Sequence, residues 1–161
     1  MSANWYEQVF KNFDDAADTY NNEAKIQKEI AIQLAELSSK YPIPKGLWLD
    51  LGSGTGFLAE ALEKIHYNQP VTRVDIAPQM LGKHSENSKK KIWDLNKGLP
   101  VFQNPPTFIS SSFALHWLTQ PSIRLKEWFN CLASGGWIAI ALPIEGSFEE
   151  WHQAATRANL E

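Results

Sequence analysis

The sequence predicts an α/β fold in which the strands of a mainly parallel sheet alternate with helices. Three observations support this prediction. Short apolar runs recur along the chain, and the segments between them carry apolar residues at helical spacing. Glycines follow the first run directly, and an acidic residue stands near the end of each of the next two. Strands that alternate with helices of these lengths form parallel sheets through right-handed crossovers.

The first half of the chain is expected to hold one long helix and two strand–helix units. The long helix is indicated by four apolar residues on one helical face: Ile26, Ile30, Leu34 and Leu37. After a turn-rich stretch, residues 47–51 are predicted as a buried strand and residues 57–65 as a helix. Residues 71–76 are predicted as the second strand, and Pro78 is expected in the first turn of a short helix.

The second half repeats this alternation. Residues 92–94 are predicted as a short third strand, and residues 107–112 as a fourth. Ser122 is expected to cap the helix that follows. Residues 137–142 are predicted as the fifth strand, and residues 148–160 as a last helix.

Composition excludes several classes of protein. The chain of 161 residues is 43% hydrophobic and 20% charged, which is typical of one globular domain. Its net charge of -3 argues against a nucleic-acid binder. Its apolar runs fall short of the roughly 18 residues of a membrane span, and Met1–Trp5 lacks secretory-signal features. Cys131 is the single cysteine, so no internal disulfide can form, and with no secretory signal we expect a reduced cytoplasmic protein. The net charge and the short apolar runs predict no nucleic-acid or membrane partner.

The glycines Gly52, Gly54 and Gly56 follow the first predicted strand in an Asp-x-Gly-x-Gly-x-Gly pattern, which begins at Asp50. Such a turn lets backbone amides approach a ligand, and the helix N-terminus beyond it favours an anionic group. A dinucleotide-binding turn would need glycine at its sixth position, where Phe57 stands. The lysine-containing loop that binds nucleoside triphosphates is absent from the sequence. The turn therefore favours a different ligand.

Two acidic residues extend this pattern. Asp75 ends the second predicted strand, where a carboxylate can accept hydrogen bonds from both hydroxyls of a ribose. Asp94 ends the third, where it can accept from an adenine amino group. Taken alone, each could equally be a capping or loop acid. Together with the glycine turn, they lie in order along the carboxyl edge of the sheet, where α/β proteins bind ligands.

These motifs resemble those of class I S-adenosylmethionine-dependent methyltransferases, which have a Rossmann-like fold. Residues 49–56, Asp75 and Asp94 carry the resemblance. Residues 13–27 and 110–117 are similar to the malonyl-acyl-carrier-protein O-methyltransferases of biotin synthesis. Two positions depart from that pattern: Ser53 stands where cysteine is common, and His116 replaces the usual glutamine.

The resemblance also implies a domain organisation. The whole of 1–161 is expected to be one methyltransferase domain. Within it, residues 1–40 would form an N-terminal helical lid and residues 46–161 a cofactor-binding core. Members of the family continue with further strands, so the chain is expected to be truncated after its fifth strand.

The resemblance further implies a site for S-adenosylmethionine, which leaves as S-adenosylhomocysteine. The expected cofactor-binding residues lie on the lid or near the strand ends: Gln27, Asp50, Gly52, Ser53, Gly54, Gly56, Asp75, Ile76, Met80, Asp94, Leu95, Ser111 and Ser112. Tyr20, His116 and Trp117 are expected at the substrate edge. No catalytic base and no metal are assigned, because a carboxylate acceptor is already ionised at neutral pH.

The activity implied is methylation of the free carboxylate of malonyl-acyl-carrier protein. Two alternatives stay open: methylation of another small carboxylate or metabolite, and a catalytically silent cofactor-binding or interaction module. An acidic carrier protein would need a basic surface, to which Lys25, Lys28 and residues 89–91 could contribute. The lysine run 89–91 could equally be a solvated turn. His66 and His84 are expected to be structural or on the surface, and Cys131 a small buried residue.

Overall fold

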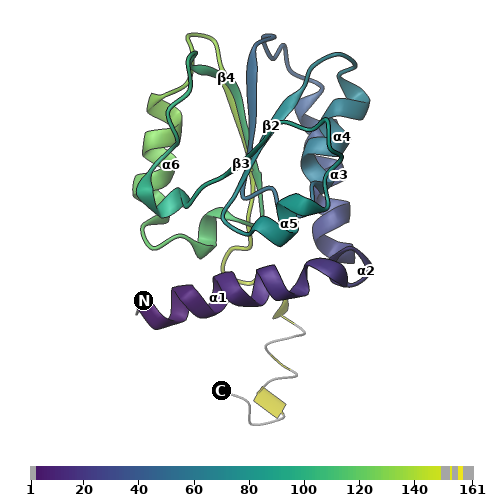
Figure 1. Cartoon of the computed structure of the whole chain (residues 1–161), viewed down its shortest axis with the longest axis vertical. Helices are drawn as coiled ribbons and strands as arrows, with labels where there is room; N and C mark the ends of the chain where they lie inside the picture. The colour runs from purple at the N-terminus through teal and green to yellow at the C-terminus, as the bar shows by residue number, and fades with distance from the viewer. Residues whose placement is uncertain (1–2, 150–152, 154–155, 158–161) are drawn as a thin grey trace.

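The computed structural model describes residues 3–149, 153, 156 and 157, and in this part of the chain five parallel strands form one sheet (Figure 1). The order across the sheet is β3-β2-β1-β4-β5, and each neighbouring pair is parallel. The bounds are β1 (Leu47–Leu51), β2 (Val71–Asp75), β3 (Lys90–Ile92), β4 (Pro106–Ser112) and β5 (Trp137–Ala141). The predicted α/β class with a parallel sheet is therefore confirmed.

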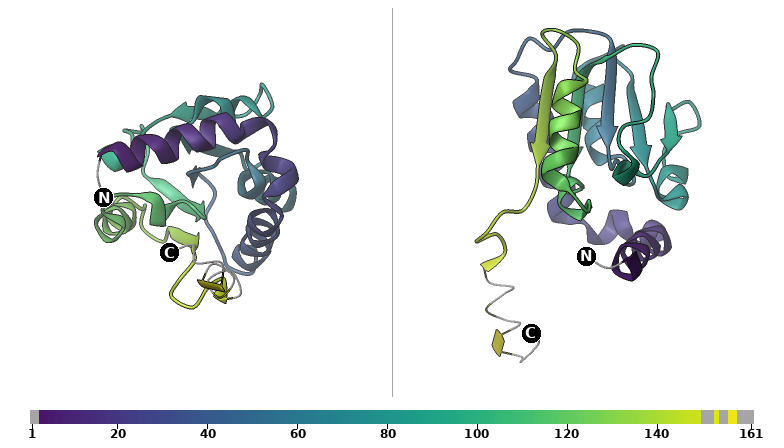
Figure 2. Two further views of the ribbon diagram at one scale, coloured as in Figure 1. Left: turned by 90° about the horizontal axis from the view of Figure 1, so that it is seen from below. Right: turned by 90° about the vertical axis from the view of Figure 1, so that its left-hand side faces the viewer.

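Helices cover both faces of the sheet and one of its ends. Their bounds are α1 (Ala3–Asp15), α2 (Tyr20–Glu23), α3 (Lys25–Ser38), α4 (Phe57–Ile65), α5 (Pro78–Gly82) and α6 (Pro121–Asn130). Figure 1 shows α3 and α4 on one side of the sheet and α6 on the other. Both views in Figure 2 show α1 lying across the end of the sheet at which the strands finish. None of the helices described is long and apolar enough to cross a membrane.

The core is divided by the sheet, because successive residues of a strand face opposite sides. On one side, Trp48 and Phe108 pack with residues of α3 and α4. On the other, Leu49 and Ile109 pack with Trp128 of α6, which is fully buried. The two clusters pack against both faces of β1 at the centre of the sheet, so the segment that follows β1 starts from a rigidly packed strand.

The helix α1 is held against α5. The carboxylate of Asp14 accepts a hydrogen bond from the backbone N–H of Gln79 at 2.8 Å, and Asp18 forms an ion pair with Lys83. Between these contacts, Ala17 is buried against Met80. The N-terminal helices are therefore fixed over the sheet end by contacts that involve both charge and packing.

The buried face of α3 differs from the expected one. Ile26 and Leu37 are 53% and 51% exposed, whereas Ala31 and Ala35 are buried against α4. Small alanine side chains let two helices approach closely, so the neighbouring helix and not the largest side chains decides which face is buried.

Three other predictions need correction or fall outside the described residues. The third strand is at residues 90–92, because Lys90 and Ile92 pair with β2, and the predicted range 92–94 is wrong. Ser122 does not cap α6, which begins at Pro121 after Gln120, since proline fits a first helical turn. The predicted helix 148–160 lies largely outside the described residues.

Candidate functional site

A cavity lies between the carboxyl ends of the strands and α1. It is lined by the segments that follow β1, β2, β3 and β4 and by side chains of α1. The cavity holds about 980 Å³ of space free of atoms, part of it open to solvent. In α/β proteins, ligands bind at this end of the sheet, where the strand order reverses. Here that reversal falls between β1 and β4.

The turn after β1 forms the bottom of this cavity. Gly52 has a φ of +71°, and a Cβ atom there would overlap the methyl group of Ala114. Gly54 has a φ of +51° and lines the cavity, and a Cβ there would meet no atom within 4 Å. Glycine is thus required at Gly52 by the fold, whereas at Gly54 the missing side chain leaves open space beside the backbone.

Asp75 ties this turn to the end of β2. Its Oδ2 accepts a hydrogen bond from the Gly54 N–H at 2.7 Å, and its Oδ1 accepts from the Ala77 N–H at 2.9 Å. Burial raises the pKa of Asp75, although these backbone hydrogen bonds oppose the shift. Each carboxylate oxygen has a second acceptor position, so Asp75 can also receive a hydroxyl group from a ligand. We call residues 52–56 and Asp75 the glycine floor.

Asp50 lies beneath the glycine floor. It is 1% exposed, and its Oδ2 accepts a hydrogen bond from the Ala59 N–H, in the first turn of α4, at 3.2 Å. Burial raises the pKa of Asp50 to about 7, against the opposing effects of Arg73 and this hydrogen bond. Asp50 therefore anchors the start of α4 while also lining the cavity.

Aromatic side chains form the opposite side of the cavity. The ring of Phe13 makes edge contacts with Trp117 and Tyr20, at centroid distances of 5.6 and 6.3 Å. Tyr20 also stacks on Phe57 at 6.1 Å, and burial raises the pKa of its hydroxyl. Phe10 of α1 completes the lining on this side. We call Phe10, Phe13, Tyr20 and Trp117 the aromatic wall.

The structure brings most of the expected site residues to one cavity. Those that line it are Tyr20, Gln27, Asp50, Gly52, Ser53, Gly54, Asp75, Ile76, Met80, Leu95, Ser112 and Trp117. They come from α2, α3 and the ends of four strands, so segments far apart in sequence meet here.

Four expected residues lie outside the lining. The Ser111 hydroxyl donates to the Leu51 carbonyl at 2.8 Å, inside the sheet. Asp94 accepts from the Asn96 N–H at 2.9 Å at the start of a short helical turn. Gly56 faces the ring of His84, and His116 lies against Phe113 and Trp117, where burial lowers its pKa.

Several lining residues were not identified from the sequence. Val9, Phe10, Phe113 and Leu118 line the cavity, but as apolar residues they carry no motif that separates a lining role from core packing. His84 was expected to be structural or on the surface, and it is not on the surface, because it is 5% exposed and hydrogen-bonded within the glycine floor.

Buried hydroxyl groups without partners test whether the cavity fits the expected cofactor. Ser53 Oγ, Thr55 Oγ1 and Ser112 Oγ are buried and have no hydrogen-bond partner among the described residues. All three residues line the cavity. Buried polar groups normally find a partner, so these hydroxyls fit a ligand with polar groups along this edge. The described residues contain no cluster of side chains suited to a metal ion.

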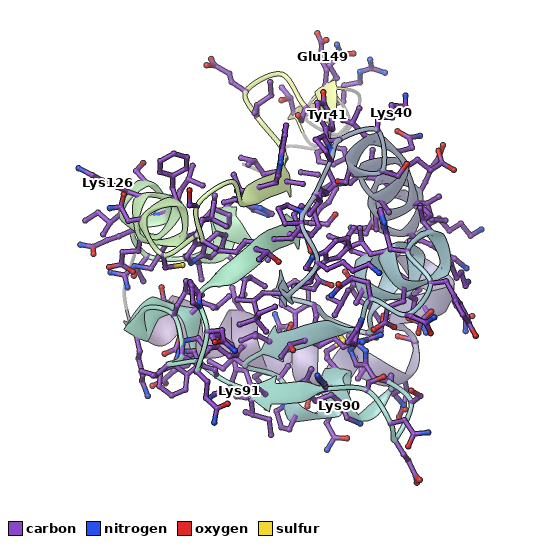
Figure 3. All side chains as sticks on the ribbon, turned by 90° about the horizontal axis from the view of Figure 1, so that it is seen from above. Lys40, Tyr41, Lys90, Lys91, Lys126 and Glu149 are labelled. Carbon is purple, nitrogen blue, oxygen red and sulfur yellow. The ribbon has the colours of Figure 1, made fainter. Side chains whose placement is uncertain are left out.

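The lysines considered for an acidic partner lie at two separate places. Lys90 and Lys91 belong to the outer strand β3, as Figure 3 shows, and line a hollow at the amino ends of the strands. Lys91 is half-buried, with its Nζ atom 5.4 Å from the centroid of the Phe102 ring. Lys28 lies at the other end of the sheet, 5.8 Å from the centroid of Phe57, which lines the cavity.

Comparison with known sequences gives one family and several relatives. A family described as "Methyltransferase domain" matches residues 22–160. The biotin biosynthesis bifunctional protein BioCD of Bordetella avium is 34% identical over 91% of this chain and 32% of its own length. The malonyl-[acyl-carrier protein] O-methyltransferase of Bacillus cytotoxicus is 27% identical over 94% of this chain and 55% of its own. Trans-aconitate 2-methyltransferase of Mycobacterium tuberculosis is 34% identical over 68% of this chain and 41% of its own.

Solved structures share the fold. The DhpI-SAM-HEP complex superposes with a TM-score of 0.75 at 18% identity, over 96% of this chain and 73% of that one. A phosphoethanolamine N-methyltransferase of Haemonchus contortus, in complex with S-adenosylhomocysteine, gives 0.62 at 19% identity, over 87% and 33%. The chain spans about a third to half of the length of the curated relatives it matches.

Proposed function

This chain belongs to the S-adenosylmethionine-dependent methyltransferase family, and on that premise we propose that it binds S-adenosylmethionine in the cavity between α1 and the strand ends. One observation carries this proposal: the three buried hydroxyls without partners line the same cavity as Asp75 and the open face of Gly54. Together they offer a polar floor for a ligand that carries hydroxyl and amino groups. The cofactor would supply a methyl group on a positively charged sulfur.

In this proposal the residues of the glycine floor and their neighbours divide the binding. Asp75 accepts hydrogen bonds from the ribose hydroxyls with the acceptor positions that Gly54 and Ala77 leave open. Ser53 and Ser112 offer their hydroxyls to the amino-acid part. Asp94, which lies after β3 and outside the lining, is proposed to reach the adenine amino group from its edge.

We propose that the acceptor is a carboxylate. Among the described residues that line the cavity, the ionisable side chains are those of Tyr20, Asp50 and Asp75. A carboxylate is ionised at neutral pH and can attack without a base, whereas an alcohol or ammonium acceptor would have to lose a proton. What remains for the protein is to align the acceptor in line with the methyl group and to exclude water. The aromatic wall is suited to both.

A malonyl group on an acyl carrier protein is the proposed form of this carboxylate. The similarity to BioCD and to malonyl-[acyl-carrier protein] O-methyltransferases supports that choice. An acidic carrier would then dock at the cavity end of the molecule, where Lys25 and Lys28 begin α3. Lys90 is at the opposite end of the strands and is not expected to touch the carrier.

The test is transfer of a labelled methyl group from S-adenosylmethionine to malonyl-acyl-carrier protein, with trans-aconitate and free malonate as competing acceptors. Methyl ester formed on the carrier-bound group supports the proposal, and preference for a free acid identifies the substrate as a small carboxylate. Lys25→Glu is expected to raise KM for the carrier, and Lys90→Glu is the matched control. A chain that binds S-adenosylhomocysteine but methylates none of these acids would contradict the proposed reaction.

A further inference from the structure

Three hydrogen-bonded side chains, those of Glu63, Arg73 and His84, lie behind the glycine floor. Arg73 of β2 is 2% exposed and donates to both carboxylate oxygens of Glu63, at 2.6 and 2.7 Å. It also donates to the Val71 carbonyl at 2.8 Å. Burial disfavours the charge on Glu63, but hydrogen bonds from Arg73 and Val71 outweigh it and hold its pKa below the usual value. Arg73 is thus fixed as a buried cation with a defined orientation.

The remaining contact of Arg73 determines the protonation of His84. Arg73 Nε donates to His84 Nδ1 at 3.2 Å, and a guanidinium group can only donate. Nδ1 must therefore be the unprotonated nitrogen of the imidazole. The other nitrogen, Nε2, lies 2.9 Å from the Gly54 carbonyl oxygen, which can only accept. The contacts are satisfied together by one form of His84, the neutral ring with its proton on Nε2.

His84 completes the fixation of one residue of the glycine floor, Gly54. Gly54 donates its N–H to Asp75 and accepts from His84 with its carbonyl oxygen, so the residue is held from two directions. Gly56 leaves the room for this ring, because a Cβ at that position would lie 2.5 Å from the His84 ring. His84 itself does not line the cavity. It can therefore affect a ligand only through the backbone of the glycine floor.

We propose that His84, oriented by Arg73 and Glu63, is a positioning residue that holds Gly54 in its ligand-binding conformation, and that acid releases this hold and weakens cofactor binding. The inference rests on the proposed binding of S-adenosylmethionine. A second proton would place an N–H at Nδ1 directly opposite the Arg73 N–H, so the hydrogen bond would become a repulsive contact. The ring would then have to turn or move away.

The charges around His84 set the pH at which this happens. Burial lowers the pKa of His84; its hydrogen bond with Gly54 opposes the shift, and the positive charge of Arg73 adds to it. Of the other charged groups, Glu60 and Glu63 favour a charged ring and Lys90 disfavours it. The neutral ring is therefore the form present at neutral pH. The binding-competent fraction falls only as the pH drops through a value below the ordinary 6.5 of histidine.

The first experiment is nitrogen NMR of the histidine rings in the ligand-free 161-residue chain between pH 5 and 8. The expected result is a neutral His84 with its proton on Nε2 at pH 7.5, assigned by loss of its signals in His84→Gln. A ring that is charged, or protonated on Nδ1, at pH 7.5 would overturn the proposal. This measurement needs no methyl acceptor and no cofactor.

The second experiment is titration calorimetry with S-adenosylhomocysteine over the same pH range, on the wild type, His84→Gln, His84→Ala and His66→Gln. His66 follows the last residue of α4 and packs against Trp48, outside the glycine floor, and it is the matched control. In the wild type and the control, we expect Kd to rise by up to about tenfold per pH unit below the pKa of His84. His84→Ala is expected to weaken binding by about tenfold at pH 7.5, because the Gly54 carbonyl loses its buried donor.

The comparison with His84→Gln isolates the titration of His84 from that of Asp50 and Asp75. Glutamine can donate to Gly54 and accept from Arg73 but cannot titrate, so its Kd should lack the acid rise seen in the wild type. Equal pH dependence in the wild type and His84→Gln would refute the proposal while leaving cofactor binding intact. Absence of binding at every pH would instead refute the proposed cofactor site, and this role with it.

Discussion

The two sides of the cavity are built in different ways. The glycine floor is made of backbone, fixed by Asp75, His84 and the Val74 carbonyl, which accepts from the N–H groups of Gly52 and Ser53 at 2.8 and 3.2 Å. The aromatic wall is made of side chains: Phe13 touches Trp117 and Tyr20 edge to face, and contacts of Asp14 and Asp18 hold the N-terminal helices in place. The floor therefore admits few substitutions, whereas the wall can be rebuilt from other apolar residues.

This difference separates two kinds of specificity. A floor of fixed amides and carboxylates suits a cofactor that does not vary among relatives. A wall of packed rings suits an acceptor site, because it can change shape without moving the floor. Changes to the floor should therefore affect folding and cofactor binding, and changes to the wall should affect mainly the acceptor.

The largest expected effect concerns the buried carboxyl beneath the floor. The pKa of Asp50 is about 7 in the folded chain and about 4 when unfolded, so between these values the folded state keeps a proton that the unfolded state loses. Its contribution to the free energy of unfolding should therefore fall by about 1.4 kcal/mol for each unit by which the pH rises from 4 to 7. Urea unfolding of the wild type and Asp50→Asn across this range measures it. Parallel stability curves would show that Asp50 is ionised in the folded state.

The next largest effect is expected from Gly52→Ala. The new methyl group would overlap Ala114, and the φ of +71° is unfavourable for alanine. Strain and overpacking together should lower the free energy of unfolding by about 3 kcal/mol. Chemical denaturation provides the measurement, and Gly52→Ala combined with Ala114→Gly should recover part of the loss. A single variant as stable as the wild type would mean that the turn is looser than this contact implies.

Gly54→Ala should separate binding from folding within the same turn. Its methyl group would meet no protein atom, so only the strain of its φ, about 1–2 kcal/mol, reduces stability. Inside the cavity, however, that methyl occupies space proposed for the cofactor. Calorimetry should show Kd for S-adenosylhomocysteine raised by about 100-fold, a loss near 2.7 kcal/mol. Unchanged affinity would place the cofactor away from the floor.

The smallest effect on the cofactor is expected from the wall. Phe13→Leu removes edge contacts with Trp117 and Tyr20 worth about 0.5–1.5 kcal/mol each. Kd for S-adenosylhomocysteine should change less than tenfold, while KM for the methyl acceptor rises by more. The matched control is Phe129→Leu, at a side chain on α6 that is 65% exposed. A larger loss for the cofactor than for the acceptor would erase the distinction between floor and wall.

The same difference explains what the sequence could predict. The strand 47–51 and the turn after it were predictable because a positive φ and the nearby methyl group of Ala114 leave glycine as the residue that fits at Gly52. The wall was predicted only in part, since Phe10 looks like a core residue until the fold brings it to the cavity.

Other differences have physical causes of the same kind. The start of β3 could not be predicted from the sequence, because its first two residues are lysines of the run 89–91. Charged side chains are uncommon in a strand unless it lies at the edge of the sheet. The burial of His84 depends on Arg73, eleven residues earlier, and on the missing side chain of Gly56. Neither contact leaves a periodic pattern in the sequence.

The most direct test of the central claim is an NMR titration of the chain with S-adenosylhomocysteine that follows its backbone amides. The predicted result is saturable shifts that are largest at residues 52–56 and 75–77, with little change at residues 101–103 in the hollow at the other end of the strands. Absence of saturable shifts, or shifts confined to that hollow, would contradict a cofactor site on the glycine floor.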